Sequence, residues 1–165
     1  MTTTYFQKFF SPVGELYIYA SSNELLAITM STNRAQVLKQ IGIAEVIEKS
    51  NAVLRVTILQ LKKYFKGELK NFNVPVKLIG TKFQTANWAA LQKIPFGKVR
   101  SYSEQARILK NKSAVRAVGA ANSRNPILIV IPCHRLVGSR GHLTGYTGGL
   151  SAKAKLLAIE GSEEI

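Results

Sequence analysis

Residues 125–135 read Asn-Pro-Ile-Leu-Ile-Val-Ile-Pro-Cys-His-Arg, in which an apolar run between two prolines leads directly into a cysteine. A short continuous apolar run predicts a buried, extended segment. Each proline restricts its own backbone and that of the residue before it, so both ends of the run are stiff. We therefore expect residues 126–132 to be extended and to hold Cys133 in a fixed position.

Cys133 is the only cysteine in the chain, which excludes an intramolecular disulfide and the usual cysteine-rich zinc sites. A lone cysteine is most often an inert buried residue. Here His134 and Arg135 follow it, and a polar loop covers residues 138–149. A cysteine thiol has an ordinary pKa of about 8.5 and is mostly protonated at pH 7, and such neighbours favour its thiolate form. From these residues alone, Cys133 could be either a nucleophile or an inert core residue.

The residues before the apolar run predict three helices. Capping-box patterns start the first two, at Thr81–Gln84 and Ser101–Glu104. The third helix is expected over residues 114–122.

A tight polar turn over Lys110–Lys112 separates the second and third of these helices. Asn111 is the residue expected in the left-handed conformation, and Ser113 is the expected cap of the third helix. Two short helices joined in this way predict a helix-turn-helix, an element that many proteins place in the major groove of DNA. The pattern is weak by itself because other helical hairpins share it.

Strands are expected mainly in the first third of the chain. Alternating β-formers on both sides of a polar turn predict a hairpin over residues 15–20 and 25–30. Apolar residues at helical spacing predict a helix over 51–66 that ends at Gly67. The other expected elements are an extended segment and a last helix: 72–78, with Pro75 marking a sheet edge, and 151–160, followed by Gly161.

The chain is strongly basic. Its 165 residues include 23 lysines and arginines and nine acidic residues, all glutamate, for a net charge of +14. Without aspartate, a Ser-His-Asp triad and aspartate-based Mg²⁺ sites are excluded in their usual form. This excess predicts a polyanionic partner, with nucleic acid ahead of a membrane surface. A basic surface kept for solubility remains the alternative.

Hydropathy predicts a folded protein that does not enter a membrane. Hydrophobic residues make up 46% of the chain, which is enough for a packed core. No apolar run approaches the ~18 residues that a membrane span needs. The first residues lack the apolar core of a secretory signal. We therefore expect an intracellular location and no membrane partner.

Several motifs, in a fixed order, resemble those of one family. Ile131–Arg135, preceded by Asn125-Pro126 and followed by Tyr146–Gly149, is similar to the signature of the O6-alkylguanine-DNA alkyltransferases, also called methylated-DNA–protein-cysteine methyltransferases. The other matching motifs lie in the C-terminal half: Gly80–Gln84, Trp88, Ile94–Gly97, Ser101-Tyr102 and Arg116–Gly119. The N-terminal part resembles the family only in outline.

The resemblance implies an α+β protein of two domains. Residues 1–80 would form a small ribonuclease-H-like domain with an antiparallel sheet. It would pack on a mostly helical domain, residues 81–165, that carries the helix-turn-helix, DNA binding and alkyl transfer. Some members hold a structural zinc, but Cys133 is needed for catalysis, so no metal is expected. No other cofactor is expected either, because the DNA supplies the alkyl group.

The resemblance also implies an enzyme that repairs DNA by direct damage reversal. Members of the family bind double-stranded DNA containing O6-alkylguanine and flip the damaged base out of the stack. A cysteine then accepts the alkyl group in one step, once per protein molecule. O4-alkylthymine is a further candidate substrate. The protein is expected to act as a monomer in the cytoplasm, or in the nucleus of a eukaryotic source.

Residue by residue, the resemblance assigns the reacting group and its support. Cys133 matches the nucleophile, and His134 matches the histidine that takes its proton through a water. Glu160 matches the glutamate that orients this histidine, and Asn125 matches the residue that braces the active-site turn. The residues that match substrate and DNA contacts are Tyr102, Arg116, Tyr146, Thr147, Gly148, Ser103 and Ser139.

Two of these contacts have defined roles in the family. Tyr102 matches the tyrosine whose hydroxyl meets the guanine, and Arg116 matches the arginine that takes the place of the flipped base. This chain also departs from the family pattern. Lysines replace a glycine in the turn of the helix-turn-helix, Arg100 stands where a small residue is usual, and Thr147 replaces a common serine. Arg100 and the lysines are expected near the DNA backbone.

Three other functions remain as alternatives. A cysteine-dependent hydrolase would use Cys133, His134 and Glu160 with water, and would turn over many times. A helix-turn-helix regulator without chemistry would read sequence and would not need Cys133. A damage sensor would be alkylated and then regulate genes, but such sensors usually need a further domain.

Overall fold

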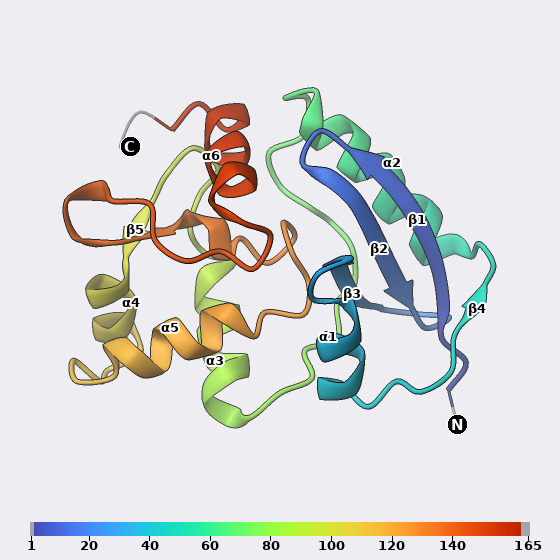
Figure 1. Ribbon diagram of the computed structural model, residues 1–165, viewed down its shortest axis with the longest axis horizontal. Helices are drawn as coiled ribbons and strands as arrows, with labels where there is room; N and C mark the ends of the chain where they lie inside the picture. The colour runs from blue at the N-terminus through green and yellow to red at the C-terminus, as the bar shows by residue number, and fades with distance from the viewer. Residues whose placement is uncertain (1, 163–165) are drawn as a thin grey trace. The chain divides into compact units, whose positions relative to one another are not determined.

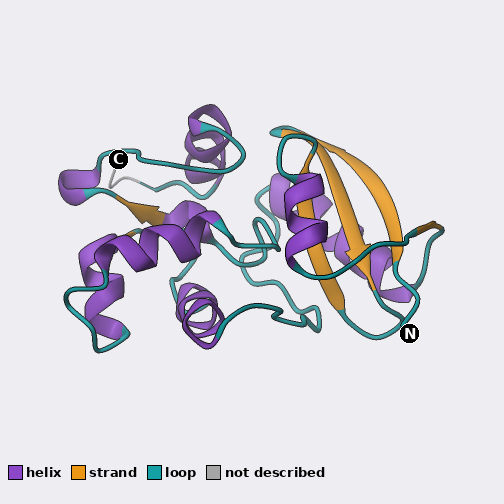
Figure 2. Cartoon of the chain, turned by 60° about the horizontal axis from the view of Figure 1, so that its bottom comes forward, coloured by secondary structure: helices purple, strands orange, loops and turns teal. Residues whose placement is uncertain are grey.

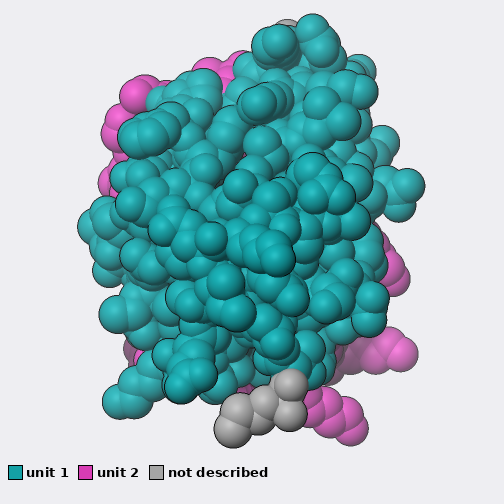
Figure 3. Space-filling model, turned by 90° about the vertical axis from the view of Figure 1, so that its right-hand side faces the viewer, with its two compact units in different colours: residues 1–79 teal, residues 80–165 magenta. Residues whose placement is uncertain are grey.

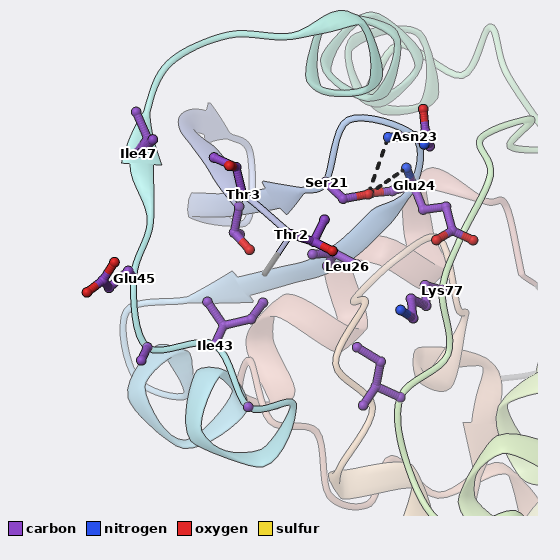
Figure 4. A pocket seen from close by; sticks show the side chains of 14 residues that line it. Thr2, Thr3, Ser21, Asn23, Glu24, Leu26, Ile43, Glu45, Ile47 and Lys77 are labelled. Carbon is purple, nitrogen blue, oxygen red and sulfur yellow. Dashed lines mark hydrogen bonds between the residues drawn. The ribbon is translucent and has the colours of Figure 1, made fainter.

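The structure of this protein is a computed structural model that describes residues 2–162. Its elements fall into two units, residues 1–79 and residues 80–165 (Figures 1 and 3). The expected α+β class is confirmed, with a sheet in the first unit and mainly helices in the second. Within the described residues, no helix is long and apolar enough to cross a membrane.

Unit 1, residues 1–79, contains a four-stranded sheet with the strand order β3-β2-β1-β4. The hairpin predicted over residues 15–20 and 25–30 is confirmed as the antiparallel pair β2 and β3. β4 pairs with β1 in parallel, so the predicted antiparallel pairing is wrong at this edge of the sheet. β4 follows helix α1, and a crossover connection delivers parallel strands. The strands are β1 (Tyr5–Ser11), β2 (Gly14–Ala20), β3 (Leu25–Met30) and β4 (Ile47–Glu48).

Two helices lie on opposite faces of this sheet (Figures 1 and 2). Side chains alternate between the faces of a strand, so Tyr17 and Tyr19 of β2 point to the same side. There they form a cluster with Val37 and Ile41, at and just after helix α1. Helix α2 packs across β1, β2 and β3 from the other side. The helices are α1 (Arg34–Gln40) and α2 (Ala52–Phe65).

The helix predicted over residues 51–66 is confirmed as α2, and Asn51 explains where it begins. The Asn51 side-chain oxygen accepts a hydrogen bond from the backbone N–H of Leu54 at 2.9 Å. Its amide nitrogen donates to the carbonyl of Ser21 at 2.9 Å, which ties the helix to the end of β2. The extended segment predicted over 72–78 makes one isolated bridge to β3.

Unit 2, residues 80–165, surrounds a two-stranded parallel pair, β5 and β6, with four helices. Both predicted capping boxes are present, at the starts of α3 and α4. The elements are α3 (Lys82–Leu91), β5 (Arg100–Ser101), α4 (Tyr102–Ile108), α5 (Val115–Ser123), β6 (Leu136–Val137) and α6 (Leu150–Ile159), with short 3₁₀ helices at Cys133–Arg135 and Ser139–Gly141.

Helices α4 and α5 occupy the predicted helix-turn-helix, but two details of the turn were predicted wrongly. Lys110, not Asn111, has the left-handed backbone, with φ of 58°. The N–H of Asn111 donates to the carbonyl of Ala106 at 3.0 Å. This hydrogen bond is typical of a helix C-terminus that is followed by a left-handed residue, here Lys110 after α4. Ser113 donates to the Asn111 side chain at 2.9 Å, so Ala114 begins α5 without a side-chain cap.

The apolar run between the prolines is buried as predicted, but it is not extended. The N–H of Ile131 bonds the carbonyl of Ile127 at 3.0 Å, so the run folds back on itself. At its centre, Ile129 has φ of 74°, which is rare for a β-branched residue. The surrounding structure must hold such a residue in place. Periodicity could not predict this turn, because it depends on side-chain contacts at both ends of the run.

Candidate active site

Cys133 opens a single 3₁₀ turn directly after the folded run. Asn125 braces this turn: its Nδ2 donates to the carbonyl of Ile131 at 2.8 Å, and its Oδ1 accepts from the N–H of Ile127 at 2.9 Å. One buried side chain thus joins both ends of the run and sets the position of Cys133. Cys133 is only 2% exposed.

Asn122, which no sequence motif had pointed to, supports the same turn from α5. Its Nδ2 donates to the carbonyl of Cys133 at 3.3 Å. Helix α5 is in turn held against α3, because the Trp88 indole N–H donates to the carbonyl of Ala121 at 2.8 Å. The second helix of the helix-turn-helix and the reactive turn are therefore mechanically linked.

His134 and Glu160 lie together although they are 26 positions apart in the chain. His134 Nε2 is 2.7 Å from Glu160 Oε1, and both side chains are buried. Arg135 also binds this carboxylate, donating from Nε and Nη2 at 2.9 Å each, and its Nη1 donates to the carbonyl of Ile94 at 2.6 Å. Glu160 is the C-cap of α6, where the helix dipole disfavours a negative charge. These two partners explain why a carboxylate is held there.

The protonation states follow from this geometry. Burial opposes ionisation of Glu160, but hydrogen bonds from His134 and Arg135 outweigh burial and lower its pKa to about 2. Burial also lowers the pKa of His134, against the opposite effect of Glu160, so the imidazole is neutral at pH 7. A neutral imidazole must carry its proton on Nε2 to donate to the carboxylate. Its Nδ1 has no hydrogen-bond partner among the described residues and is free to accept a proton.

Cys133 is a protonated thiol in this state. Burial raises its pKa to about 11, and the Asn125 side chain and the charge of Lys153 only partly oppose that effect. His134 and Arg135, as neighbours of Cys133 in the sequence, were expected to favour a thiolate. That expectation is wrong for the resting protein, because Arg135 pairs with Glu160 and His134 is neutral. Activation therefore needs a base.

Lys153 on α6 is a buried cation that was not among the residues predicted to form the site. Its Nζ donates to the carbonyls of Leu136 at 2.5 Å and Thr144 at 2.6 Å, which ties the loop after β6 to that strand. Burial lowers its pKa to about 8, while the nearby Cys133 opposes that effect. A signal was present, because Lys153 falls three residues before the buried Leu156, on the apolar stripe of the helix.

The residues expected to contact substrate surround this network at different depths. Tyr102 begins α4 and is half-buried, as are Tyr146, Thr147 and Gly148 of the loop after β6. Burial and the nearby Cys133 and Glu160 raise the pKa of Tyr146 well above its usual value. Tyr146 therefore lies in the electrostatic surroundings of the thiol.

Arg116, Ser103 and Ser139 are exposed and lie outside the buried network. Apart from the nearby backbone of α5 itself, no atom lies within 4 Å of where a Cβ on Gly119 would stand, so the helix surface is open at this point. Arg100 has an internal role, contrary to expectation, since its Nη1 donates to the Gln105 side chain at 2.7 Å. Among the described residues, no group of three potential ligands could hold a metal ion.

Two family models match the chain. Residues 82–162 match the DNA binding domain of 6-O-methylguanine DNA methyltransferase, and residues 4–78 match its ribonuclease-like domain. The chain is 40% identical to the methylated-DNA–protein-cysteine methyltransferase of Methanosarcina acetivorans, over 96% of this chain and 99% of that protein. It is 41% identical to the protein of the same name from Mycobacterium leprae, over 91% and 88% of the two chains.

Solved structures give the same result. Mycobacterium tuberculosis OGT in complex with DNA has a TM-score of 0.84 and 37% identity, covering 97% of this chain and 96% of that one. The O6-methylguanine-DNA methyltransferase of Pyrococcus kodakaraensis has a TM-score of 0.69 and 28% identity, covering 96% and 99%. Both likenesses extend over nearly the whole chain.

Proposed function

Because this chain belongs to the 6-O-methylguanine DNA methyltransferase family, we propose that Cys133 is the residue that accepts the alkyl group from O6-alkylguanine in DNA. The family membership inferred from motifs is confirmed, and with it the function of direct-reversal DNA repair by alkyl transfer to a cysteine. One observation carries the assignment of the residue: the only cysteine of the chain stands beside a buried, neutral histidine with a free ring nitrogen.

His134 is the base in this proposal. The thiol proton moves from Sγ through a bridging water to Nδ1, the ring nitrogen that Glu160 leaves free. The imidazolium that forms is then paired with the ionised Glu160 carboxylate, which offsets the cost of a buried positive charge. Arg135 keeps this carboxylate ionised and aligned before the reaction begins.

The transfer is a single displacement. A bond forms between the Cys133 sulfur and the alkyl carbon while the bond from that carbon to guanine O6 breaks. The electron pair goes to the base, and a hydrogen bond from the Tyr102 hydroxyl stabilises the charge that develops there. The base then takes up a proton equivalent to the one that left the thiol. The products are a thioether on the protein and unmodified guanine in the DNA.

The remaining predicted residues hold the DNA in this proposal. Tyr146, Thr147 and Gly148 form the wall of the pocket for the flipped base, and the Thr147 hydroxyl anchors that wall by donating to the carbonyl of Ser123 at 3.2 Å. Arg116, exposed on α5, enters the stack in place of the base. Ser103 and Ser139 are exposed and lie free to contact phosphate or sugar.

In this proposal the two domains of one chain divide the work between them. Residues 81–165 form the DNA-binding and transfer domain, and residues 1–80 form the ribonuclease-like domain. A single chain supplies the whole network, so the protein acts on double-stranded DNA as a monomer. A reduced thiol is required, which favours the cytoplasm. O4-alkylthymine is a second proposed substrate.

The deciding experiment uses duplex DNA with one O6-methylguanine that is labelled in the methyl group. We expect one label per protein molecule on a Cys133 peptide, because a thioether is not displaced by water and the chain has no second cysteine. Cys133→Ala should bind the duplex and take no label. Repeated release of labelled methanol would support the hydrolase alternative, and label on any other residue would refute the assignment.

A further inference from the structure

Helix α2 has a surface that the proposed reaction does not use. Its apolar side is buried against the sheet, and the side chains buried there are Val53, Leu54, Thr57, Leu61 and Tyr64. At 3.6 residues per turn, these five lie within roughly 100° around the helix axis. The opposite side of the helix faces solvent over its whole length.

Three exposed cations form a straight row on that opposite side. Arg55, Lys62 and the C-cap Lys66 fall within roughly 40° of one another around the axis and span about 16 Å along it. We call these three residues the α2 basic row. No acidic residue occurs from position 49 to position 67. Within the described part of the chain, no carboxylate lies within ion-pair distance of the row.

The row differs from an ordinary solvated helix face, on which charges of both signs are usually interspersed. It also differs from a membrane-surface helix, which needs a broad apolar face to enter the lipid. Here that face is occupied by the sheet, and the large apolar side chains left exposed on α2 are Val56 at 43% and Leu59 at 54%. A line of unpaired cations on a convex surface is better suited to bind a polyanion with regularly spaced charges than to enter a membrane.

We infer that the α2 basic row binds phosphates of duplex DNA, as a second DNA contact outside the unit that carries Cys133. The inference rests on the proposed function, which brings duplex DNA to the protein. At 3.4 Å of duplex axis per base pair, the length of the row spans about five base pairs of phosphates. Cations that contact phosphates release condensed counterions, so each contact adds to the salt dependence of binding. This contact carries no sequence preference, because the row touches no base.

The test is the salt dependence of binding to an undamaged 30-base-pair duplex. The full-length variant Arg55→Gln/Lys62→Gln/Lys66→Gln removes the row and keeps good helix formers on an exposed face. The matched control, Lys8→Gln/Lys39→Gln/Lys49→Gln, removes the same charge from exposed positions elsewhere in unit 1. A third variant, Arg55→Lys/Lys62→Arg/Lys66→Arg, keeps the charge. Reaction with labelled O6-methylguanine in a short duplex shows that each variant is folded and active.

We expect the slope of log affinity against log salt to fall by up to about 2.7 in the row variant, or about 0.9 per lost contact. If affinities converge at 1 M salt, this is up to about 500-fold weaker binding at 0.1 M. The control and the charge-keeping variant should retain the slope of the parent protein. Equal losses in the row variant and the control would overturn the inference in favour of diffuse charge.

Three further outcomes decide between this inference, the proposed function and a membrane contact. A parent protein that binds DNA but transfers no methyl group would refute the proposed function and leave the slope comparison intact. An unchanged slope in an active row variant would overturn only the inference. Binding to vesicles with anionic lipid that is lost in the row variant, with DNA binding unchanged, would assign the row to a membrane surface and also overturn it.

Discussion

Glu160 joins the reactive turn to the last helix through two buried partners, His134 and Arg135. Glu160→Gln keeps the shape of the side chain but leaves the Arg135 cation without its charge partner. We expect this variant to lose about 3–5 kcal/mol of unfolding free energy at pH 7. The measurement is urea unfolding, with the exposed Glu68→Gln as the control, which should stay within about 0.5 kcal/mol of the parent.

The same carboxylate predicts a pH dependence. Its pKa is lowered from 4.5 to about 2 in the folded protein, so the unfolded chain binds its proton first as the pH falls. The stabilisation is therefore complete above pH 4.5 and is lost on acidification toward pH 2, by roughly 3 kcal/mol in total. The difference between the parent and Glu160→Gln should shrink over this range. A difference that stays constant down to pH 2.5 would contradict the ionised pair.

Lys153 links the loop after β6 to the reactive thiol. Lys153→Met removes the donor to the Leu136 and Thr144 carbonyls and the cation that favours a Cys133 thiolate. We expect slower transfer at pH 7, and a rate that rises only at higher pH because the thiol loses its proton less readily. The control is Lys155→Met, exposed on the same helix. Equal pH–rate profiles for the two variants would remove Lys153 from this role.

At the scale of elements, the folded run at residues 126–132 depends on an unfavourable backbone conformation at Ile129. Ile129→Ala and Ile127→Ala remove similar buried side chains. Replacing each of these alanines by glycine then shows how the backbone conformation at that position contributes to the free energy of unfolding. At position 129, with its positive φ, that step should stabilise by roughly 1 kcal/mol. At position 127 it should destabilise by roughly 0.5–1 kcal/mol. Urea unfolding of the four variants measures both steps, and equal signs would contradict the strained turn.

At the scale of the whole molecule, methylation of Cys133 should lower the melting temperature. Cys133 is 2% exposed in a packed turn, so an added methyl group overfills the site, at a cost of roughly 1–3 kcal/mol. For a chain of this length, that corresponds to a decrease of roughly 3–10 °C. The measurement compares melting curves before and after reaction with methylated DNA, with the DNA removed. An unchanged melting temperature would show that the site has room for the methyl group.

Local sequence determined much of the fold. The capping boxes, the β2–β3 hairpin and helix α2 are set by residues close together in the chain, so spacing and turn chemistry were sufficient to predict them. The motifs around Cys133 likewise indicated the family. The turn after α4 was predicted less well, because several neighbouring residues there can adopt the left-handed conformation.

Tertiary structure alone decided the chemistry of the site. His134 meets Glu160 across 26 positions, Lys153 reaches carbonyls of another segment, and Asn125 folds the apolar run back on itself. Burial then makes Cys133 a thiol and His134 neutral, which reverses what their neighbours in the sequence suggested. The physical reason is that a pKa depends on desolvation and on charges close in space, and neither can be read from adjacent positions in a chain.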